Sequence, residues 1–189
     1  VLYDRQKETL IFCSRAKSGR LALPGTITEI DDNALKNCAG LTEVTLPDSL
    51  TLIGGNAFMD CKGLTQVTLP KAVEISYGNP FWGCEGLESI VLDAENPHYT
   101  CQDDVLYNKD MTELICFPGG KGGDFEIPES VLKLRYEAFF GCRKLASIRI
   151  PARMGIGNGY ENYFADCDAL TEISVDASNP NASSKGKML

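Results

Sequence analysis

A repeat of 23 residues constrains this chain more than any other feature of its sequence. Residues 41–63 and 64–86 align without a gap. The same step relates four sets of apolar residues, which are Leu41/Leu64/Leu87, Val44/Val67/Ile90, Leu46/Leu69/Leu92 and Cys38/Cys61/Cys84. A fixed period of 20 to 50 residues is the signature of stacked supersecondary units. The sequence therefore predicts a repeat architecture.

A longer period is superimposed on the first. Residues 1–41 align without gaps to 105–145, with many more identities than the roughly two or three expected from composition. They are Val1/Val105, Leu2/Leu106, Tyr3/Tyr107, Leu10/Leu114, Ile11/Ile115, Lys17/Lys121, Gly19/Gly123, Pro24/Pro128, Ala34/Ala138, Cys38/Cys142 and Leu41/Leu145. The segment 87–97 also returns at 170–180. The chain is therefore nearly two copies of one larger block.

Each 23-residue unit has a clear local interpretation. Leu-x-x-Val-x-Leu-Pro ends with apolar residues two apart, which favours a short strand with one buried face. The proline donates no amide hydrogen bond and closes the strand. Leu50-x-x-Ile53 then predicts a second short strand or arc, and Ala57-Phe58-x-x-Cys61 a tight 3₁₀-like turn.

One such unit cannot cover its own apolar face, so we expect identical coils to stack with their strands about 4.8 Å apart. The predicted fold is a β-rich, right-handed, curved solenoid of short parallel strands and 3₁₀-like turns. It forms a single domain over residues 1–189. The expected coils are 18–40, 41–63, 64–86, 87–121, 122–144, 145–169 and 170–189.

Two inserts, at about 1–17 and 93–121, interrupt the period. Val105–Tyr107 and Leu114–Phe117 flank the turn-forming segment 108–110, which predicts a β-hairpin projecting from one coil. Residues 1–13 predict a matching first hairpin. We also expect local distortion at Ser76, where the repeat calls for an apolar residue, and at 152–163, which carry two extra positions.

The repeat pattern resembles the BspA-like class of leucine-rich repeats. The motif residues are Leu41, Val44, Leu46, Pro47, Leu50, Ile53, Ala57, Phe58 and Cys61, with Asn96, Pro97, Tyr99, Val105, Leu106, Tyr107 and Pro118 in the insert. This resemblance implies an extracellular or surface-attached protein of host-associated bacteria. Members are often adhesins that bind extracellular-matrix or other host proteins, without catalysis. It also implies that this chain is a fragment of a longer surface protein.

The composition of the chain disfavours several classes of function. Eighteen Lys and Arg against 26 Asp and Glu give a net charge of −8, which disfavours nucleic acid as a partner. No apolar run reaches the roughly 18 residues of a membrane span, and the first residues lack a signal-peptide pattern. The single histidine, His98, leaves no His pair for zinc and restricts catalytic triads. We therefore expect no catalytic residue, no metal site and no cofactor.

The positions of the eight cysteines predict that most of them pack in the interior and do not act as reactive groups. Cys38, Cys61, Cys84, Cys142 and Cys167 share one repeat position, where stacked Cβ atoms about 4.8 Å apart are too distant for a disulfide. They are predicted to be buried free thiols. The sequence leaves open whether Cys13, Cys101 or Cys116 forms a bridge.

The outward positions of the first strands are the predicted binding surface. They are Glu43, Thr45, Gln66, Thr68, Ser89, Val91, Glu126, Ser147, Arg149, Glu172 and Ser174. Polar, mixed and flat, this surface suits a protein partner better than a small molecule, although a plain solvated face is the alternative. Tyr77 and Trp82 are candidate aromatic anchors. The expected function is a non-enzymatic protein-binding or adhesion module, and the alternative is a structural spacer without a ligand.

Overall fold

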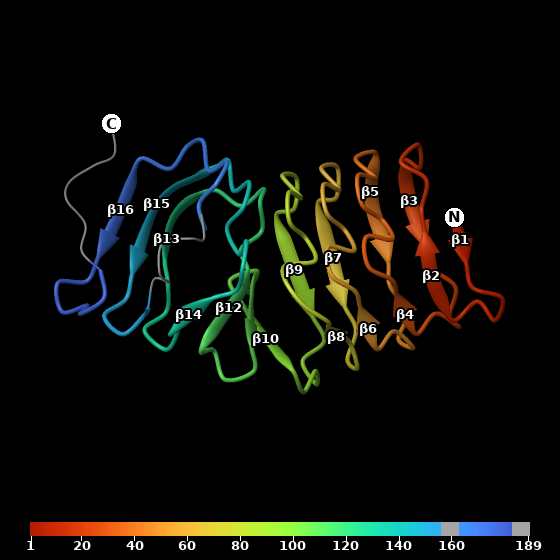
Figure 1. Ribbon diagram of the computed structural model, residues 1–189, viewed down its shortest axis with the longest axis horizontal. Helices are drawn as coiled ribbons and strands as arrows, with labels where there is room; N and C mark the ends of the chain where they lie inside the picture. Colours follow the sequence, from red (N-terminus) through yellow and green to blue (C-terminus); the bar gives the residue numbers. More distant parts are fainter. Residues whose placement is uncertain (156–162, 183–189) are drawn as a thin grey trace.

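The computed structural model describes residues 1–155 and 163–182, which form an elongated stack of coils (Figure 1). The first coil lies at one end of the long axis and β16 (Glu172–Val175) at the other. Each regular coil contributes a strand of about four residues, a two-residue strand and a turn. The described residues contain no helix. The predicted solenoid is confirmed.

The longer strands form one side of the stack, here called the strand wall. Its members are β3 (Gly19–Ala22), β5 (Leu41–Thr45), β7 (Gln66–Leu69), β9 (Ser89–Leu92), β13 (Gly123–Glu126), β15 (Leu145–Ile150) and β16. They pair in parallel as β3–β5, β7–β9 and β13–β15–β16. The pairs Leu21↔Val44 and Val67↔Ile90 show that equivalent repeat positions lie in register. Within each of these sheets, a strand is thus continued by its copy in the next coil.

The second strand of each coil builds a neighbouring side, the short-strand wall. It comprises β2 (Thr9–Phe12), β4 (Glu29–Ile30), β6 (Leu52–Ile53), β8 (Glu74–Ile75), β12 (Glu113–Cys116) and β14 (Lys133–Leu134). The first four are joined in parallel, and β12 pairs in parallel with β14. The predicted arc after each proline is therefore a two-residue strand in most coils.

The third side of the stack is formed by the turns and is here called the turn wall. Its backbone amides donate hydrogen bonds alternately to the next coil and within their own turn. The amides of Leu35 and Asn37 donate to Ala57 and Met59 of the next coil, at 2.8 and 2.7 Å. The intervening amides of Lys36 and Cys38 donate three residues back within their own turn. This alternation requires left-handed backbone at two positions per turn, which asparagine tolerates, as at Asn33 and Asn37. The predicted tight turn is confirmed.

The interior contains a column of phenylalanines. Phe58 stacks on Phe81 with ring centroids 5.3 Å apart, and Phe139 lies 5.2 Å from Phe117 and 5.5 Å from Phe164. Phe58, Phe81 and Phe139 are buried. Phe58 with Phe81, and Phe139 with Phe164, are the pairs that stacking of equivalent coils requires, because each ring covers its equivalent in the next coil.

A ladder of thiols runs beside the phenylalanines. All eight cysteines are free. Of the five that were predicted to be buried, Cys38, Cys61, Cys84 and Cys142 are buried and Cys167 is half-buried; Cys13 and Cys116 are buried as well. Thiols of the regular coils donate to a carbonyl of the preceding coil: Cys61 Sγ donates to Leu35 O at 3.2 Å, and Cys84 Sγ donates to Phe58 O at 3.1 Å. Burial raises the pKa of Cys61 to about 12. These thiols are small hydrophobes that also satisfy backbone acceptors.

The second insert differs from its prediction. Residues 99–116 form an antiparallel meander of β10 (Tyr99–Gln102), β11 (Val105–Asn108) and β12, so the hairpin exists. It does not project from the coil, however, because Val105, Leu106 and Leu114 are fully buried. An insert with so many apolar residues gains more from entering the core than from extending into water.

The first insert repeats the second. In the hairpin of β1 (Leu2–Tyr3) and β2, Leu2 pairs with Phe12 and Tyr3 with Leu10. Leu106 pairs with Cys116 and Tyr107 with Leu114 at the same offset of 104 and with the same irregularity. The predicted correspondence between the two hairpins is confirmed.

The distortion at Ser76 is a slip of one residue. Ile75 pairs with Ile53, so it occupies the buried position that the repeat alignment assigned to Ser76, which is exposed. The surplus residue is accommodated before Phe81, where Gly78 has a φ of +61°. The expected distortion within 152–163 lies largely outside the described residues.

Candidate protein-binding surface

The predicted surface residues lie on the strand wall and are exposed or half-buried. They alternate with buried residues such as Val44, Val67 and Ile148, as the pleat of a strand requires. Register aligns them in columns, with Gln66 opposite Ser89 and Thr68 opposite Val91. In the second half, Ser147 lies opposite Glu172 and Arg149 opposite Ser174. Whether these residues bind a partner remains a prediction.

The surface is not continuous along the stack. The β10–β11 turn contacts the strand wall beside β9: Ser89 Oγ donates to Asp104 Oδ1 at 2.9 Å, and Lys121 Nζ lies 3.2 Å from Asp104 Oδ2. The hydroxyl of Ser89 and the ammonium of Lys121 hold the pKa of Asp104 below its usual range. Asp104 therefore joins the insert to the strand wall.

The insert divides the predicted surface into two patches. The N-terminal patch consists of Glu43, Thr45, Gln66, Thr68, Ser89 and Val91. The C-terminal patch consists of Glu126, Ser147, Arg149, Glu172 and Ser174. Sequence periodicity missed this division, because it gives the order of coils along the chain and not the place where an insert packs.

A groove of about 370 Å³ opens within the N-terminal patch, between β5 and β7. In the part of the chain that the structure describes, no ladder joins these two strands, although equivalent strands pair on either side. Threonines dominate its lining, which is Thr42, Glu43, Val44, Thr45, Leu46, Thr65, Gln66 and Thr68. The groove thus offers hydroxyl, amide and carboxylate groups together.

Tyr77 is exposed, but its side chain is already held. The hydroxyl donates to Asp32 Oδ2 at 2.8 Å, which raises the pKa of Tyr77. Its ring lies against Gly55, where an added Cβ would come within 2.2 Å of ring atoms. Tyr77 thus spans two coils of the turn wall, which lies away from the strand wall.

Trp82 is half-buried and lies against another coil. Its ring meets Phe140 edge to face with centroids 4.9 Å apart, and Asn79 Nδ2 donates to Glu137 O at 3.1 Å beside it. The coil at 64–86 therefore contacts the coil at 122–144 directly on the turn wall, while the insert fills the space on the other side. This contact between residues 58 apart could not be read from a 23-residue period.

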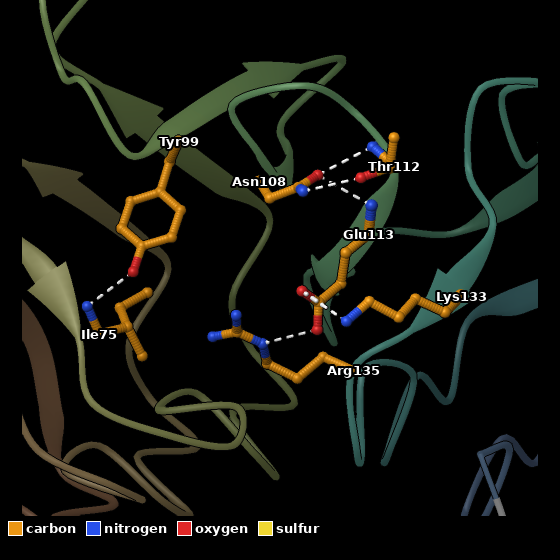
Figure 2. Close-up of polar contacts among 7 residues, drawn as sticks. All are labelled: Ile75, Tyr99, Asn108, Thr112, Glu113, Lys133 and Arg135. Atoms are coloured by element: carbon orange, nitrogen blue, oxygen red, sulfur yellow. Dashed lines mark hydrogen bonds and ion pairs between the residues drawn. The ribbon is translucent and has the colours of Figure 1, made fainter.

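A polar cluster marks the same junction on the short-strand wall (Figure 2). The Tyr99 hydroxyl accepts the amide of Ile75 at 2.7 Å and so satisfies the edge of β8. Glu113 lies 3.2 Å from Arg135 Nε and 3.5 Å from Lys133 Nζ. Asn108 fixes the turn before Glu113 by accepting two backbone amides. The Tyr99 bond thus holds the insert to the preceding coil, and the Glu113 ion pairs hold it to the following coil.

Metal ligands and membrane-spanning segments were the other features of interest in the described residues. Over residues 1–155 and 163–182, no three His, Cys, Asp or Glu side chains are grouped so as to hold a metal ion. In the same ranges, no helix has the length and apolar character needed to cross a bilayer.

The repeat and its geometry can be compared with known proteins. A family model described as the BspA type leucine rich repeat region matches residues 9–119 and 112–185, with six copies of the repeat. This chain belongs to the BspA-type leucine-rich repeat family. The search of curated proteins gave no match. The match to the family model confirms the resemblance inferred from the motif.

Solved structures of bacterial leucine-rich repeat proteins share the fold. The pneumococcal vaccine antigen PcpA is 27% identical, with a TM-score of 0.73 over 82% of this chain and 38% of PcpA. A leucine-rich repeat protein of Eubacterium ventriosum is 22% identical, with a TM-score of 0.60, covering 82% of this chain and 53% of that one. A leucine-rich cell surface protein of Faecalibacterium prausnitzii is 21% identical, with a TM-score of 0.53, covering 89% and 63%. The chain thus spans less than two thirds of each.

Proposed function

We propose that this BspA-type chain is a non-enzymatic protein-binding module that acts outside the bacterial cell or on its surface. Its partners would be macromolecules of a host or of neighbouring cells. Family membership supports this proposal, as do the likeness to PcpA, a vaccine antigen, and to a cell surface protein of the same fold. Repeat solenoids present extended surfaces that suit protein partners.

The observation that carries the proposal is the N-terminal patch with its groove between β5 and β7. Thr45, Gln66 and Thr68 are exposed there, next to a groove of about 370 Å³. Such hydroxyl and amide groups can donate and accept hydrogen bonds without the desolvation cost of a bare charge. Val91 adds exposed apolar area in the same column as Thr68. A mixed surface of this kind fits the rim and core of a protein interface.

The test is binding to a panel of purified extracellular-matrix glycoproteins, measured by surface plasmon resonance. For any glycoprotein captured by the wild-type chain, the variant Gln66→Ala/Thr68→Ala/Val91→Asp should bind at least about tenfold more weakly. Its unfolding midpoint should be unchanged, because all three side chains point away from the core. A matched variant in the C-terminal patch, Glu126→Ala/Arg149→Ala, should keep wild-type affinity.

Two results would contradict the proposal. Capture of no glycoprotein above background would favour the spacer alternative. Equal binding by the wild type and the N-terminal variant would show that the partner uses another surface.

A further inference from the structure

The strand wall is interrupted between two coils whose residues are otherwise equivalent. β5 pairs in parallel with β3, and β7 pairs in parallel with β9, yet no ladder joins β5 to β7 in the part of the chain that the structure describes. Val44 of β5 and Val67 of β7 occupy the same repeat position, so the sequence register needed for pairing is present. The facing edges of the two strands therefore offer main-chain donors and acceptors without ladder partners in the described ranges.

The same two coils are joined normally on the other two walls. On the short-strand wall, β6 pairs with β8. On the turn wall, the amides of Phe58 and Asp60 donate to carbonyls of the next coil at 3.0 and 2.8 Å. The groove of about 370 Å³ therefore opens on the strand wall alone. A peptide strand inserted into it would need β5 and β7 about 9.6 Å apart, twice the usual strand spacing, and would break the bonds on the other walls.

The lining of the groove is polar, and its carboxylate is compensated. Four exposed threonines line it, and each hydroxyl can donate and accept a hydrogen bond; they are Thr42, Thr45, Thr65 and Thr68. The amide of Gln66 can also donate and accept. Glu43 is the charged residue of the lining, and Arg20 Nε lies 2.8 Å from its Oε2. The groove therefore favours an uncharged ligand that is rich in hydroxyl groups.

The size and the remaining lining residues narrow the class of ligand. Val44 and Leu46 complete the lining with aliphatic groups. A sugar ring presents both kinds of surface, with hydroxyl groups around its rim and C–H groups on its faces. The volume of about 370 Å³ lies near the lower end of the range for small-molecule sites, about 300–1,000 Å³. The groove therefore suits one or two sugar units.

We propose that the groove between β5 and β7 binds neutral sugar units of a glycan that the partner glycoprotein carries. This proposal rests on the function proposed above and specifies which part of the partner the N-terminal patch contacts. The hydroxyls of Thr45 and Thr68 and the amide of Gln66 bond to the sugar hydroxyls. The same ligand satisfies the unpaired edges of β5 and β7.

The first experiment titrates the isotope-labelled chain with free neutral oligosaccharides and follows its backbone amides by nuclear magnetic resonance. The probes are disaccharides and trisaccharides of galactose, mannose and N-acetylglucosamine. At least one probe should cause saturable shifts confined to residues 42–46 and 65–69. Absence of such shifts with every probe would overturn the proposal.

Paired substitutions distinguish the chemistry of the hydroxyls from the shape of the groove. Thr45→Val/Thr68→Val removes two hydroxyls at nearly constant volume and should weaken sugar binding by about tenfold. Thr45→Ser/Thr68→Ser keeps both hydroxyls and should retain wild-type affinity. Thr51→Val/Thr171→Val, at exposed threonines outside the groove, is the matched control and should bind as the wild type does. Wild-type affinity in the valine variant, or an equal loss in the serine variant, would overturn the proposal.

Deglycosylation separates this inference from the proposed function. Enzymatic removal of the glycans from a captured glycoprotein should weaken its binding to the chain by at least about tenfold. Unchanged binding after this treatment would overturn the glycan assignment and leave the proposed function standing. Binding of a free oligosaccharide without capture of any glycoprotein would support the ligand class and contradict the proposed partner.

Sialidase treatment tests the charge of the ligand. Removal of sialic acid alone should leave binding unchanged, because the groove favours neutral sugars. Loss of binding after this treatment would assign an acidic ligand and overturn the proposal.

Discussion

At the scale of residues, the turn wall depends on a few side chains that tolerate left-handed backbone. Asn33 and Asn56 occupy the first such position of their turns with φ near +60°. Glu137 occupies the equivalent position with φ of +62°, although glutamate is poorly suited to it. Burial also raises the pKa of the Glu137 carboxyl, so the charged form is disfavoured in the folded chain.

Glu137→Asn should therefore stabilise the protein by about 1 kcal/mol, because asparagine adopts left-handed backbone more readily. The raised pKa of Glu137 destabilises the wild type once the pH exceeds that pKa, and this penalty disappears when both states are protonated. The gain should thus be larger at about pH 7 than at about pH 3.5. Urea unfolding at the two pH values measures it.

Glu129→Asn is the matched control, since Glu129 is exposed and has no positive φ. It should leave the unfolding midpoint unchanged. A stability loss in Glu137→Asn would show that the native carboxylate has a favourable partner.

At the scale of elements, buried asparagines fix the turns that end the coils before an insert. Asn96 is fully buried and bonds through both its amide hydrogens and its oxygen. The motif Asn-Pro was visible in the sequence, and its duplication at 179–180 was too. Its buried amide was not predicted, because hydropathy patterns assign polar residues to the surface.

Asn96→Ala should destabilise the chain by about 3 kcal/mol, because two carbonyls and two amides lose their partner in a buried site. Denaturant unfolding measures the change. Asn181→Ala, at an exposed position next to the equivalent turn, should have little effect. A loss below about 1 kcal/mol for Asn96→Ala would indicate that water replaces the side chain.

The limits of sequence reasoning follow from the same elements. Walls, register and the interior cysteines were predictable, because each repeats at 23 residues and each obeys a local rule of alternation or spacing. The packing of residues 99–116, the contact of Trp82 with Phe140, and the groove between β5 and β7 were not. They depend on which coils become neighbours in space when the period is interrupted. The residues predicted to form the binding surface therefore lie on one wall, as expected, but they do not form one continuous surface.

At the scale of the whole molecule, the stack is two apolar clusters joined at the insert. One cluster extends from Leu10 to Cys116 and the other from Val105 to Leu170. The Trp82–Phe140 contact and the Asn79–Glu137 bond connect coils that flank the insert. Because stability in a solenoid comes from contacts between neighbours, these links decide whether the halves unfold together.

The variant Asn79→Ala/Phe140→Ala should separate the two unfolding events. In the wild type, tryptophan fluorescence from Trp82, the single tryptophan, and far-ultraviolet circular dichroism should give coincident urea transitions. In the variant, the urea transitions measured by fluorescence and by circular dichroism should no longer coincide. The pair Asn56→Ala/Met59→Ala, at the equivalent turn within one half, serves as the control and should keep the transitions coincident. Coincident curves in both variants would contradict a two-part molecule.

The backbone ladders between coils run along the long axis of the stack, with the first coil and β16 at opposite tips (Figure 1). Tension applied between those tips would therefore load the hydrogen bonds of one coil at a time, instead of shearing the bonds of many coils together. Extension would proceed in steps of a single 23-residue turn. A chain of this design would lengthen under flow while most of its coils stayed folded.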